Sequence, residues 1–321
     1  MMKAISVSQA GGPEVLQYTD VADPTPGPGQ VLIETFGTGV NFIETYERSG
    51  VYNISYPAIL GTEGAGRVVA LGEGVTNVQV GDRVATAQGI STYAELFLAE
   101  AGRVVVVPDN VSDTVAAALP LQGMTAHYLT NSTFPVKAGD VALTYAGAGG
   151  VGLLLTQILK LKGATVITTA STPEKRELAK GAGADYVLEY DDIPGKVREI
   201  TNGRGADVVY DGVGKDTFDG SLASLRTRGM LVLFGGASGQ VPPVNLQRFN
   251  AAGSLFFSRP TLKDYLLDAE EVSWRGNELF SLVAQGKLDV RVGGSYPLSD
   301  AKKAHQDLES RGTTGKLVLV P

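Results

Sequence analysis

The stretch Asp140-Val-Ala-Leu-Thr-Tyr-Ala-Gly-Ala-Gly-Gly-Val-Gly152 decides the fold of this chain. It predicts a short apolar strand, a glycine turn and then a helix that opens at Leu153. Gly147, Gly149 and Gly152 occupy the three places of the pattern G-x-G-x-x-G. In that pattern the first glycine permits a tight turn, the second lets the backbone approach a pyrophosphate, and the third lets helix and strand pack closely. The free amide groups at the helix N-terminus favour phosphate, so the stretch predicts a dinucleotide-binding site.

Predicted strands and helices alternate from Gln122 onward. The strands cover 141–146, 165–170, 186–189, 207–211 and 230–234, and the helices cover 153–162, 173–181, 192–201 and 216–225. Each strand is an apolar run without clean alternation, as expected where helices cover both faces of a sheet. This order predicts an α/β fold, a doubly wound parallel sheet of the Rossmann type with 253–258 as a last strand. A purely structural turn is the alternative in a chain with 41 glycines, but the flanking elements favour dinucleotide binding.

The first third of the chain is rich in turns and short strands. The runs 31–36, 66–72 and 81–85 contain many β-branched residues and are bounded by Gly, Pro and Asp. They predict a compact, mostly β, barrel-like module, with the proline-rich segment 23–29 as a surface loop. After Pro260 three helices are predicted, at 262–267, 278–286 and 300–310, followed by a terminal strand at 316–321.

The nucleotide-binding sheet does not need this terminal strand. We therefore expect the strand to return to the N-terminal module, which makes that module discontinuous around an inserted cofactor domain. The predicted boundaries are 1–122 for the first part of the catalytic domain, 123–262 for the NADP(H)-binding domain and 263–321 for the second part of the catalytic domain.

The composition excludes several classes of protein. The chain has 321 residues, of which 43% are hydrophobic, and a formal net charge of −7, which argues against a nucleic-acid surface. It has no cysteine and two histidines, so disulfides, thiolate nucleophiles and cysteine zinc sites are excluded. The N-terminal residues lack a signal-peptide pattern, and no segment has the apolar length of a membrane span. A cytoplasmic protein is the expectation.

The end of the second predicted strand indicates which nucleotide is bound. Folds that prefer NAD place Asp or Glu there to accept a hydrogen bond from the ribose hydroxyls. This chain has no acidic residue between Asp140 and Glu174; the strand ends near Ser171, and Lys175 and Arg176 follow. A small residue leaves room for a 2′-phosphate and a cation neutralises it, so NADP(H) is predicted. The alternative is that the two cations are solvated charges on the first turn of a helix.

Ten short motifs occur in order along the whole chain: GGPEVL (11–16), GVNFIETY (39–46), GTE (61–63), GDRV (81–84), QGMTA (122–126), AGAGGVG (146–152), YDGVG (210–214), FGGAS (234–238), SRP (258–260) and ESR (309–311). Taken together, they resemble the medium-chain dehydrogenase/reductase superfamily. Within it, they are similar to the zinc-free quinone oxidoreductases related to zeta-crystallin. The resemblance implies a GroES-like catalytic domain around a Rossmann domain.

The resemblance also predicts that no metal is bound. The zinc-dependent branch of the superfamily carries a Gly-His-Glu motif and ligating cysteines, whereas this chain has Thr62 in the place of the histidine and no cysteine. Alcohol dehydrogenase chemistry, in which zinc holds an alkoxide, is therefore not expected. Without a metal beside it, Glu63 is expected to form an ion pair or to cap a helix beneath the site.

The resemblance implies roles for individual residues. Asn41, Tyr46 and Tyr52 would hydrogen-bond the quinone carbonyl or relay solvent protons, and Thr125 would flank the nicotinamide; for the tyrosines, aromatic packing is the alternative. The residues implied to bind NADP(H) are Phe42, Tyr128, Gly147, Gly149, Gly150, Val151, Gly152, Ser171, Lys175, Tyr190, Val213, Phe234, Gly235, Ser238 and Arg311. Gly147 stands where many relatives have alanine, which is expected to alter the turn without removing its function.

The reaction implied is hydride transfer from NADPH to a quinone. Reduction of a quinone makes an aromatic ring, so the chemistry needs orientation more than a strong acid. Three alternatives stay open: an enoyl or alkenal reductase that attacks a carbon–carbon double bond, an RNA-binding protein, and an NADPH-binding sensor without turnover. The acidic net charge weighs against RNA.

Four further residues receive structural interpretations. His127 is expected in a core or interface, His305 is expected to be exposed on a late amphipathic helix, and Trp274 is expected to pack. Relatives commonly form homodimers through the cofactor domain, so the resemblance implies a dimer in which a strand near Leu255 extends the sheet.

Overall fold

The computed structural model describes residues 1–321, which form two compact units. Unit 2 is Thr125–Tyr265, and unit 1 combines Met1–Met124 with Leu266–Pro321. The chain therefore leaves unit 1 and returns to it, which is the arrangement of an inserted domain. None of the helices has both the length and the hydrophobicity needed to cross a bilayer.

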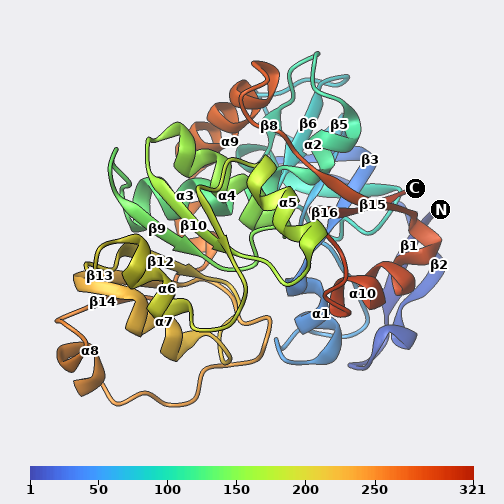
Figure 1. Ribbon diagram of the computed structural model, residues 1–321. Coiled ribbons are helices and arrows are strands. Elements are labelled where there is room, and N and C mark those ends of the chain that lie inside the picture. The colour runs from blue at the N-terminus through green and yellow to red at the C-terminus, as the bar shows by residue number, and fades with distance from the viewer. The chain divides into compact units, whose positions relative to one another are not determined.

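Unit 2 is built on a six-stranded parallel sheet (Figure 1). Its strands are β9 (Val141–Thr144), β10 (Thr165–Thr169), β11 (Tyr186–Leu188), β12 (Ala206–Asp211), β13 (Leu225–Leu233) and β14 (Phe256–Ser258). Their order across the sheet is β11-β10-β9-β12-β13-β14. The order reverses between β9 and β12, and doubly wound sheets bind nucleotides at such a switch point. The predicted Rossmann sheet, including its last strand, is confirmed.

Four helices connect the strands of this sheet: α4 (Gly150–Leu161), α5 (Pro173–Gly181), α6 (Ile193–Ile200) and α7 (Phe218–Ser224). Helix α4 packs against α5, and α6 packs against α7. Because right-handed crossovers on the two sides of the switch point return over opposite faces, one pair covers each face. All six residues of β12 are consequently buried. Beyond β13 stand the short helix α8 (Gln247–Ala251) and, after β14, the 3-10 turn Leu262–Tyr265.

Unit 1 is mostly β. A three-stranded sheet has the order β2 (Gln17–Val21), β1 (Met2–Val7), β4 (Ala58–Ile59). A seven-stranded sheet contains β15 (Val292–Pro297), β16 (Lys316–Val320), β3 (Gln30–Val40), β5 (Gly64–Leu71), β6 (Arg83–Thr86) and β8 (Val105–Val106), with β7 (Leu96–Glu100) also paired to β3. The terminal strand β16 pairs antiparallel with β3, so its predicted return to the N-terminal module is confirmed.

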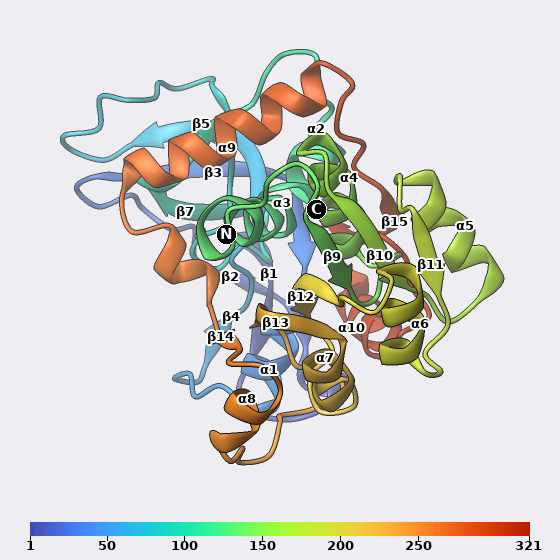
Figure 2. The same cartoon turned by 60° about the vertical axis from the view of Figure 1, so that its left-hand side comes forward.

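Five helices belong wholly or partly to unit 1. They are α1 (Phe42–Ser49), α2 (Asp113–Ala118), α9 (Ala269–Ala284), α10 (Ala301–Glu309) and α3 (Pro120–Tyr128), which begins in unit 1 and ends in unit 2. Figure 2 shows α9 as the long orange helix of this unit, and it packs against β8 and the 3-10 turn Ala101–Arg103. Two further 3-10 turns are Pro13–Val15 and Leu298–Asp300.

Several predicted elements differ from the structure. Helix α4 begins at Gly150, not at Leu153 as predicted. The amides of a helix's first turn have no acceptor within the helix, so glycine is tolerated in that turn. Helix α9 begins at Ala269, well before the predicted 278, since the Asp268 side chain accepts a hydrogen bond from Glu271 N at 2.9 Å and caps it. The predicted helix at 262–267 is only a 3-10 turn. Helices α1 and α2 were not predicted.

The prediction that His305 is exposed was wrong. His305 is 0% exposed, because both ring nitrogens find polar partners inside unit 1, on Arg48 and Tyr93. His127 is buried, as expected. Trp274 remains 46% exposed, with the Arg275 guanidinium 4.6 Å from the centre of its ring.

Candidate active site

The glycine turn after β9 is the first part of the candidate site. Gly149 precedes α4 in extended conformation and offers no side-chain cap, so the amides of Gly150, Val151 and Gly152 point out of the helix end with no acceptor in the chain. A Cβ at Gly152 would lie 2.3 Å from Ala146 O, and one at Gly147 would lie 2.3 Å from Thr168 Oγ1. The turn is therefore too tightly packed for side chains at Gly147 and Gly152, while the helix amides beside it are free to donate hydrogen bonds. This geometry fits a pyrophosphate.

The end of β10 forms the second part. Gly147 N donates to Thr169 O at 2.8 Å, which fixes the glycine turn against this strand end. Ser171 is exposed, and Lys175 is half-buried in the first turn of α5, whose N-cap Thr172 accepts from Lys175 N. Arg176 pairs with Glu189 at 3.1 Å, so its guanidinium is engaged by a carboxylate. The predicted contact of Lys175 with a 2′-phosphate stays a prediction.

Tyr190 lies near this strand end in the next loop. It is 45% exposed, and its ring stacks on Tyr145 with centroids 6.3 Å apart. Burial raises the pKa of Tyr145 beyond its ordinary range, so its hydroxyl stays protonated. The stack leaves Tyr190 partly exposed, and its predicted contact with the adenosine end of NADP(H) stays a prediction.

The loops after β12 and β13 form the third part. Asp211 ends β12 fully buried, and its carboxylate accepts from Val213 N, Gly214 N, Thr217 Oγ1 and Ser221 Oγ at 2.7–2.9 Å. Ser238 donates from its backbone N to Val213 O at 2.8 Å, and Phe234 N donates to Asp211 O at 2.9 Å. The predicted residues Val213, Phe234, Gly235 and Ser238 therefore lie together at the carboxyl edge of the sheet.

Thr125 and Tyr128 lie one turn apart on the part of α3 that belongs to unit 2. Both are buried, and Tyr128 stacks on Tyr265 with ring centroids 4.3 Å apart and planes at 8°. This near-parallel stack fixes the ring of Tyr128, so the end of α3 is rigid where the two predicted residues stand.

In unit 1, helix α1 brings three predicted aromatic residues together. Phe42 stacks on Tyr46 one turn later, with centroids 6.3 Å apart, and Tyr46 meets Tyr52 edge to face at 5.4 Å. Tyr52 N also donates to Tyr46 O at 3.0 Å, which holds the following loop against the helix. Tyr52 is 43% exposed and Tyr46 is half-buried, so this aromatic face is open to a flat ligand.

Asn41 caps α1 from a buried position. Its side-chain Nδ2 donates to Glu63 Oε2 at 3.0 Å, and its Oδ1 accepts from Lys316 Nζ. Asn41 N donates to Glu44 Oε2 at 2.7 Å, completing a capping box. Both ends of the Asn41 amide are thus engaged within unit 1, and its predicted contact with a quinone stays a prediction.

Beneath Asn41 lies a buried ion pair. Glu63 and Lys316 are both 0% exposed and bonded to each other, and Glu63 Oε1 also accepts from Leu121 N at 2.8 Å, at the start of α3. The expectation that Glu63 forms an ion pair and caps a helix is confirmed. Glu44 lies fully buried nearby, and burial raises its pKa to about 8, while the Lys316 charge opposes the rise.

Sequence reasoning missed Asp211, Glu44 and Lys316. Asp211 directly precedes the glycines of a strand–turn–helix junction, which is a readable signal for a carboxylate that organises a turn. Lys316 had no such signal, because its partner Glu63 is far from it in sequence. Arg311, predicted to reach the cofactor, lies exposed in unit 1 just after α10. No group of three or more His, Cys, Asp or Glu side chains is arranged to hold a metal ion.

Comparisons with known proteins identify the family of this chain. Two family models match, the alcohol dehydrogenase GroES-like domain at residues 27–130 and the zinc-binding dehydrogenase model at 150–272. The NADPH complex of mycobacterial Rv1454c is 52% identical, covers 100% of both chains and superposes with a TM-score of 0.98.

Two curated relatives are similar over their full length. A quinone oxidoreductase of Salmonella typhimurium is 44% identical, with 100% of both chains covered, and a 2-haloacrylate reductase of Burkholderia sp is 39% identical, with 100% of this chain and 99% of that protein covered. The second family model is named for zinc, but this chain has no cysteine to serve as a zinc ligand. The chain therefore belongs to the zinc-free quinone oxidoreductases of the medium-chain dehydrogenase/reductase superfamily.

Proposed function

We propose that this protein reduces quinones with NADPH, without a metal. The observation that carries the proposal is similarity over the full chain to a quinone oxidoreductase at 44% identity, together with an intact glycine turn and open helix end in unit 2. The 52% identical mycobacterial structure was solved with NADPH. NADPH supplies the hydride, and the protein supplies binding and orientation.

The NADPH-binding residues are proposed along the carboxyl edge of the sheet in unit 2. The amides of Gly150, Val151 and Gly152 bind the pyrophosphate, while Gly147 and Gly149 shape the turn. Lys175 neutralises the 2′-phosphate, with Ser171 leaving room for it and Tyr190 stacking on the adenine. Arg311 is proposed to join Ser171, Lys175 and Tyr190 at the adenosine phosphate. The residues proposed nearer the nicotinamide are Phe42, Thr125, Tyr128, Val213, Phe234, Gly235 and Ser238.

The quinone is proposed to stack on the aromatic face of α1. Tyr46 and Tyr52 present flat rings and hydroxyl groups, so they hold a planar acceptor and pass solvent protons to the oxygen that gains charge. Asn41 orients this face through the capping box and the buried ion pair beneath it. Net transfer of one hydride and one proton converts the quinone to a hydroquinone and leaves NADP⁺.

A double-bond reductase is the second candidate, because a relative at 39% identity is a 2-haloacrylate reductase. The test is loss of NADPH absorbance with 1,4-benzoquinone, with a bulky ortho-quinone, and with an α,β-unsaturated ketone or 2-haloacrylate. Fast turnover only with the quinones supports the proposal. Turnover only with the alkenes would identify the protein as a double-bond reductase. NADPH binding without turnover of any acceptor would favour an NADPH-binding sensor.

The cellular form of the protein is also proposed. We place it in the cytoplasm as a homodimer. In each chain the cofactor domain, residues 123–262, is inserted in the sequence of a catalytic domain formed by 1–122 and 263–321. Strand β14 is the last strand of its sheet, and Phe256 on it is 61% exposed, so a second copy has an edge on which to pair. Light scattering that gives the mass of a single chain would contradict the dimer.

A further inference from the structure

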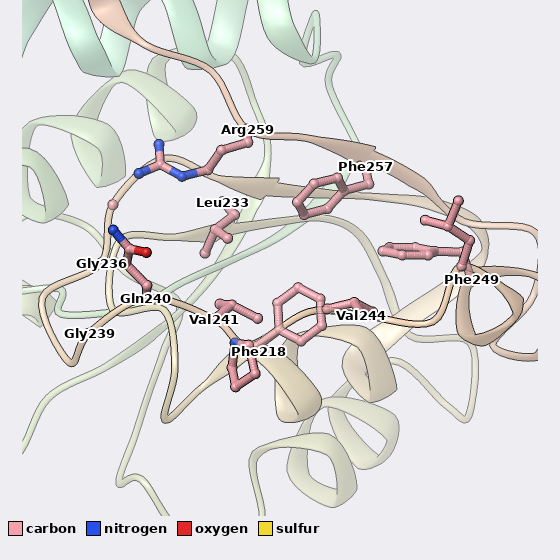
Figure 3. A pocket seen from close by; sticks show the side chains of 13 residues that line it. Phe218, Leu233, Gly236, Gly239, Gln240, Val241, Val244, Phe249, Phe257 and Arg259 are labelled. Atoms are coloured by element: carbon pink, nitrogen blue, oxygen red, sulfur yellow. The ribbon is translucent and has the colours of Figure 1, made fainter.

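An apolar cavity lies within unit 2, between β13, β14 and the segment that joins them. Its volume is about 390 Å³, within the range of about 300–1,000 Å³ typical of small-molecule pockets. Figure 3 shows the side chains that line it. They come from elements far apart in sequence, since Phe218 begins α7, Phe249 lies on α8 and Phe257 on β14.

The two ends of this cavity differ in chemistry. At one end the three phenylalanine rings meet: Phe257 lies edge to face with Phe218 at 6.3 Å and tilted against Phe249 at 5.4 Å between centroids. At the other end, Figure 3 shows the Gln240 amide and the Arg259 guanidinium beside Gly236. The cavity therefore suits a ligand with a long apolar part and a head that accepts hydrogen bonds.

The polar end lies where the cofactor is proposed to bind. Leu233 is the last residue of β13 and Arg259 directly follows β14, so both mark the carboxyl edge of the parallel sheet. Gly235, a proposed nicotinamide neighbour, also lines the cavity and directly precedes Gly236 at this end. A ligand head held there lies at the reacting end of the cofactor, while its apolar part runs toward Phe249.

We propose that this cavity binds the alkyl or prenyl tail of a substituted quinone, which enters the cavity past Gln240 and Arg259. The inference rests on the proposed quinone reductase function and makes it more specific, because it names tailed quinones as the preferred substrates. Each methylene that leaves water for the cavity strengthens binding about fourfold. Tails that fit should therefore raise kcat/KM progressively, until the cavity is full.

The first test measures kcat/KM for 2-alkyl-1,4-benzoquinones whose tails grow from methyl to decyl. These compounds share one ring and nearly one reactivity, so differences report the tail. We expect kcat/KM to rise about fourfold per methylene over the first several positions and then to reach a plateau. Equal kcat/KM along the series overturns the tail site and leaves quinone reduction standing. No NADPH oxidation with any member overturns the proposed function itself.

A second measurement needs no turnover. 4-Alkylphenols lack the quinone but keep a polar head and a tail, and we expect their inhibition constants against 1,4-benzoquinone to fall about fourfold per methylene. Val244→Phe fills the cavity and should flatten both series, whereas Val106→Phe, at a half-exposed position of β8 in unit 1, should change neither. Length dependence that persists in folded Val244→Phe contradicts the assignment. If Val244→Phe does not fold, the phenol series on the unsubstituted protein still tests the proposal, because inhibition constants independent of tail length would contradict it.

Discussion

Arg48 Nη1 lies 3.0 Å from His305 Nδ1, although the two residues are 257 positions apart in the chain. Arginine only donates, so Nδ1 must accept, and the ring proton is on Nε2, which faces Tyr93 OH at 3.1 Å. Arg48 also makes a two-pronged ion pair with Glu309, at 2.9 and 3.2 Å. The C-terminal end of α1, the helix that carries Tyr46, is thus tied to α10 through a neutral histidine.

The first prediction concerns acid stability. Burial, assisted by the charge of Arg48, lowers the pKa of His305 to about 3, from 6.5 in an unfolded chain. The unfolded chain therefore binds an extra proton between pH 6.5 and 3, so this group's stabilisation is complete above pH 6.5 and is lost as the pH falls. We expect His305→Gln to lower stability at pH 7 and to flatten the loss between pH 6.5 and 4, measured by urea unfolding. Lys302→Gln, exposed on the same helix, should keep the slope of the original protein.

The second prediction concerns Glu44, whose contribution to the unfolding free energy depends on pH in the opposite direction. Burial raises its pKa to about 8, from 4.5 in the unfolded chain, so the folded protein holds a proton that the unfolded chain releases. Its contribution to stability is complete below pH 4.5 and is lost as the pH rises to 8. Glu44→Gln keeps an acceptor for Asn41 N and should flatten the fall of the unfolding free energy between pH 6 and 8. An unchanged slope would mean that Glu44 is ionised in the fold.

The third prediction concerns the buried pair of Glu63 and Lys316. Removing one partner leaves an uncompensated buried charge, so Glu63→Gln and Lys316→Met should each cost about 3–5 kcal/mol of unfolding free energy. The double variant should cost much less than the sum of the two. Lys303→Met, in an exposed pair with Asp307, serves as the control and should cost less than about 1 kcal/mol. Additive costs in the double variant would show that the pair is not coupled.

Local signals in the sequence predict unit 2 well and unit 1 less well. The glycine turn and the apolar strands act over a few residues, as does the N-cap Thr172, whose side chain accepts a hydrogen bond from Lys175 N. Each of these signals can be recognised without knowing which residues pack against it in the fold. The Rossmann topology followed from their order, because right-handed crossovers leave few arrangements.

Long-range contacts explain what the sequence did not predict. His305 sits on an amphipathic helix, which suggested exposure, but Arg48 and Tyr93 lie far from it in sequence and make its burial possible. Lys316 is the first residue of the terminal strand, where no neighbouring residue indicates burial, yet Glu63 holds it in the core. Only Asn41 separates helix α1 from strand β3, so no loop sequence marks the start of the helix. The overlooked signal was the capping box formed by Asn41 and Glu44.

The fourth prediction tests how NADPH is distinguished from NADH. A cation on a phosphate contributes about 1.5–3 kcal/mol, so Lys175→Ala should raise KM for NADPH about tenfold or more and leave KM for NADH unchanged. Lys180→Ala, on the same helix in an exposed pair with Glu177, is the matched control and should affect neither cofactor. Ser171→Asp should add repulsion against the 2′-phosphate and favour NADH. Equal effects of Lys175→Ala on both cofactors would remove this residue from the phosphate site.

The fifth prediction tests the glycine turn. A Cβ at Gly152 would come within 2.3 Å of Ala146 O, a backbone atom that cannot move without opening the turn. Gly152→Ala should therefore displace the start of α4 and weaken NADPH binding at least tenfold, measured by calorimetry. Gly181→Ala places the same methyl group on α5, where no atom lies within 4 Å, and should leave binding unchanged and raise stability by about 0.4–1 kcal/mol. If both variants bind NADPH equally well, the close packing of α4 on this turn is not what positions its amides.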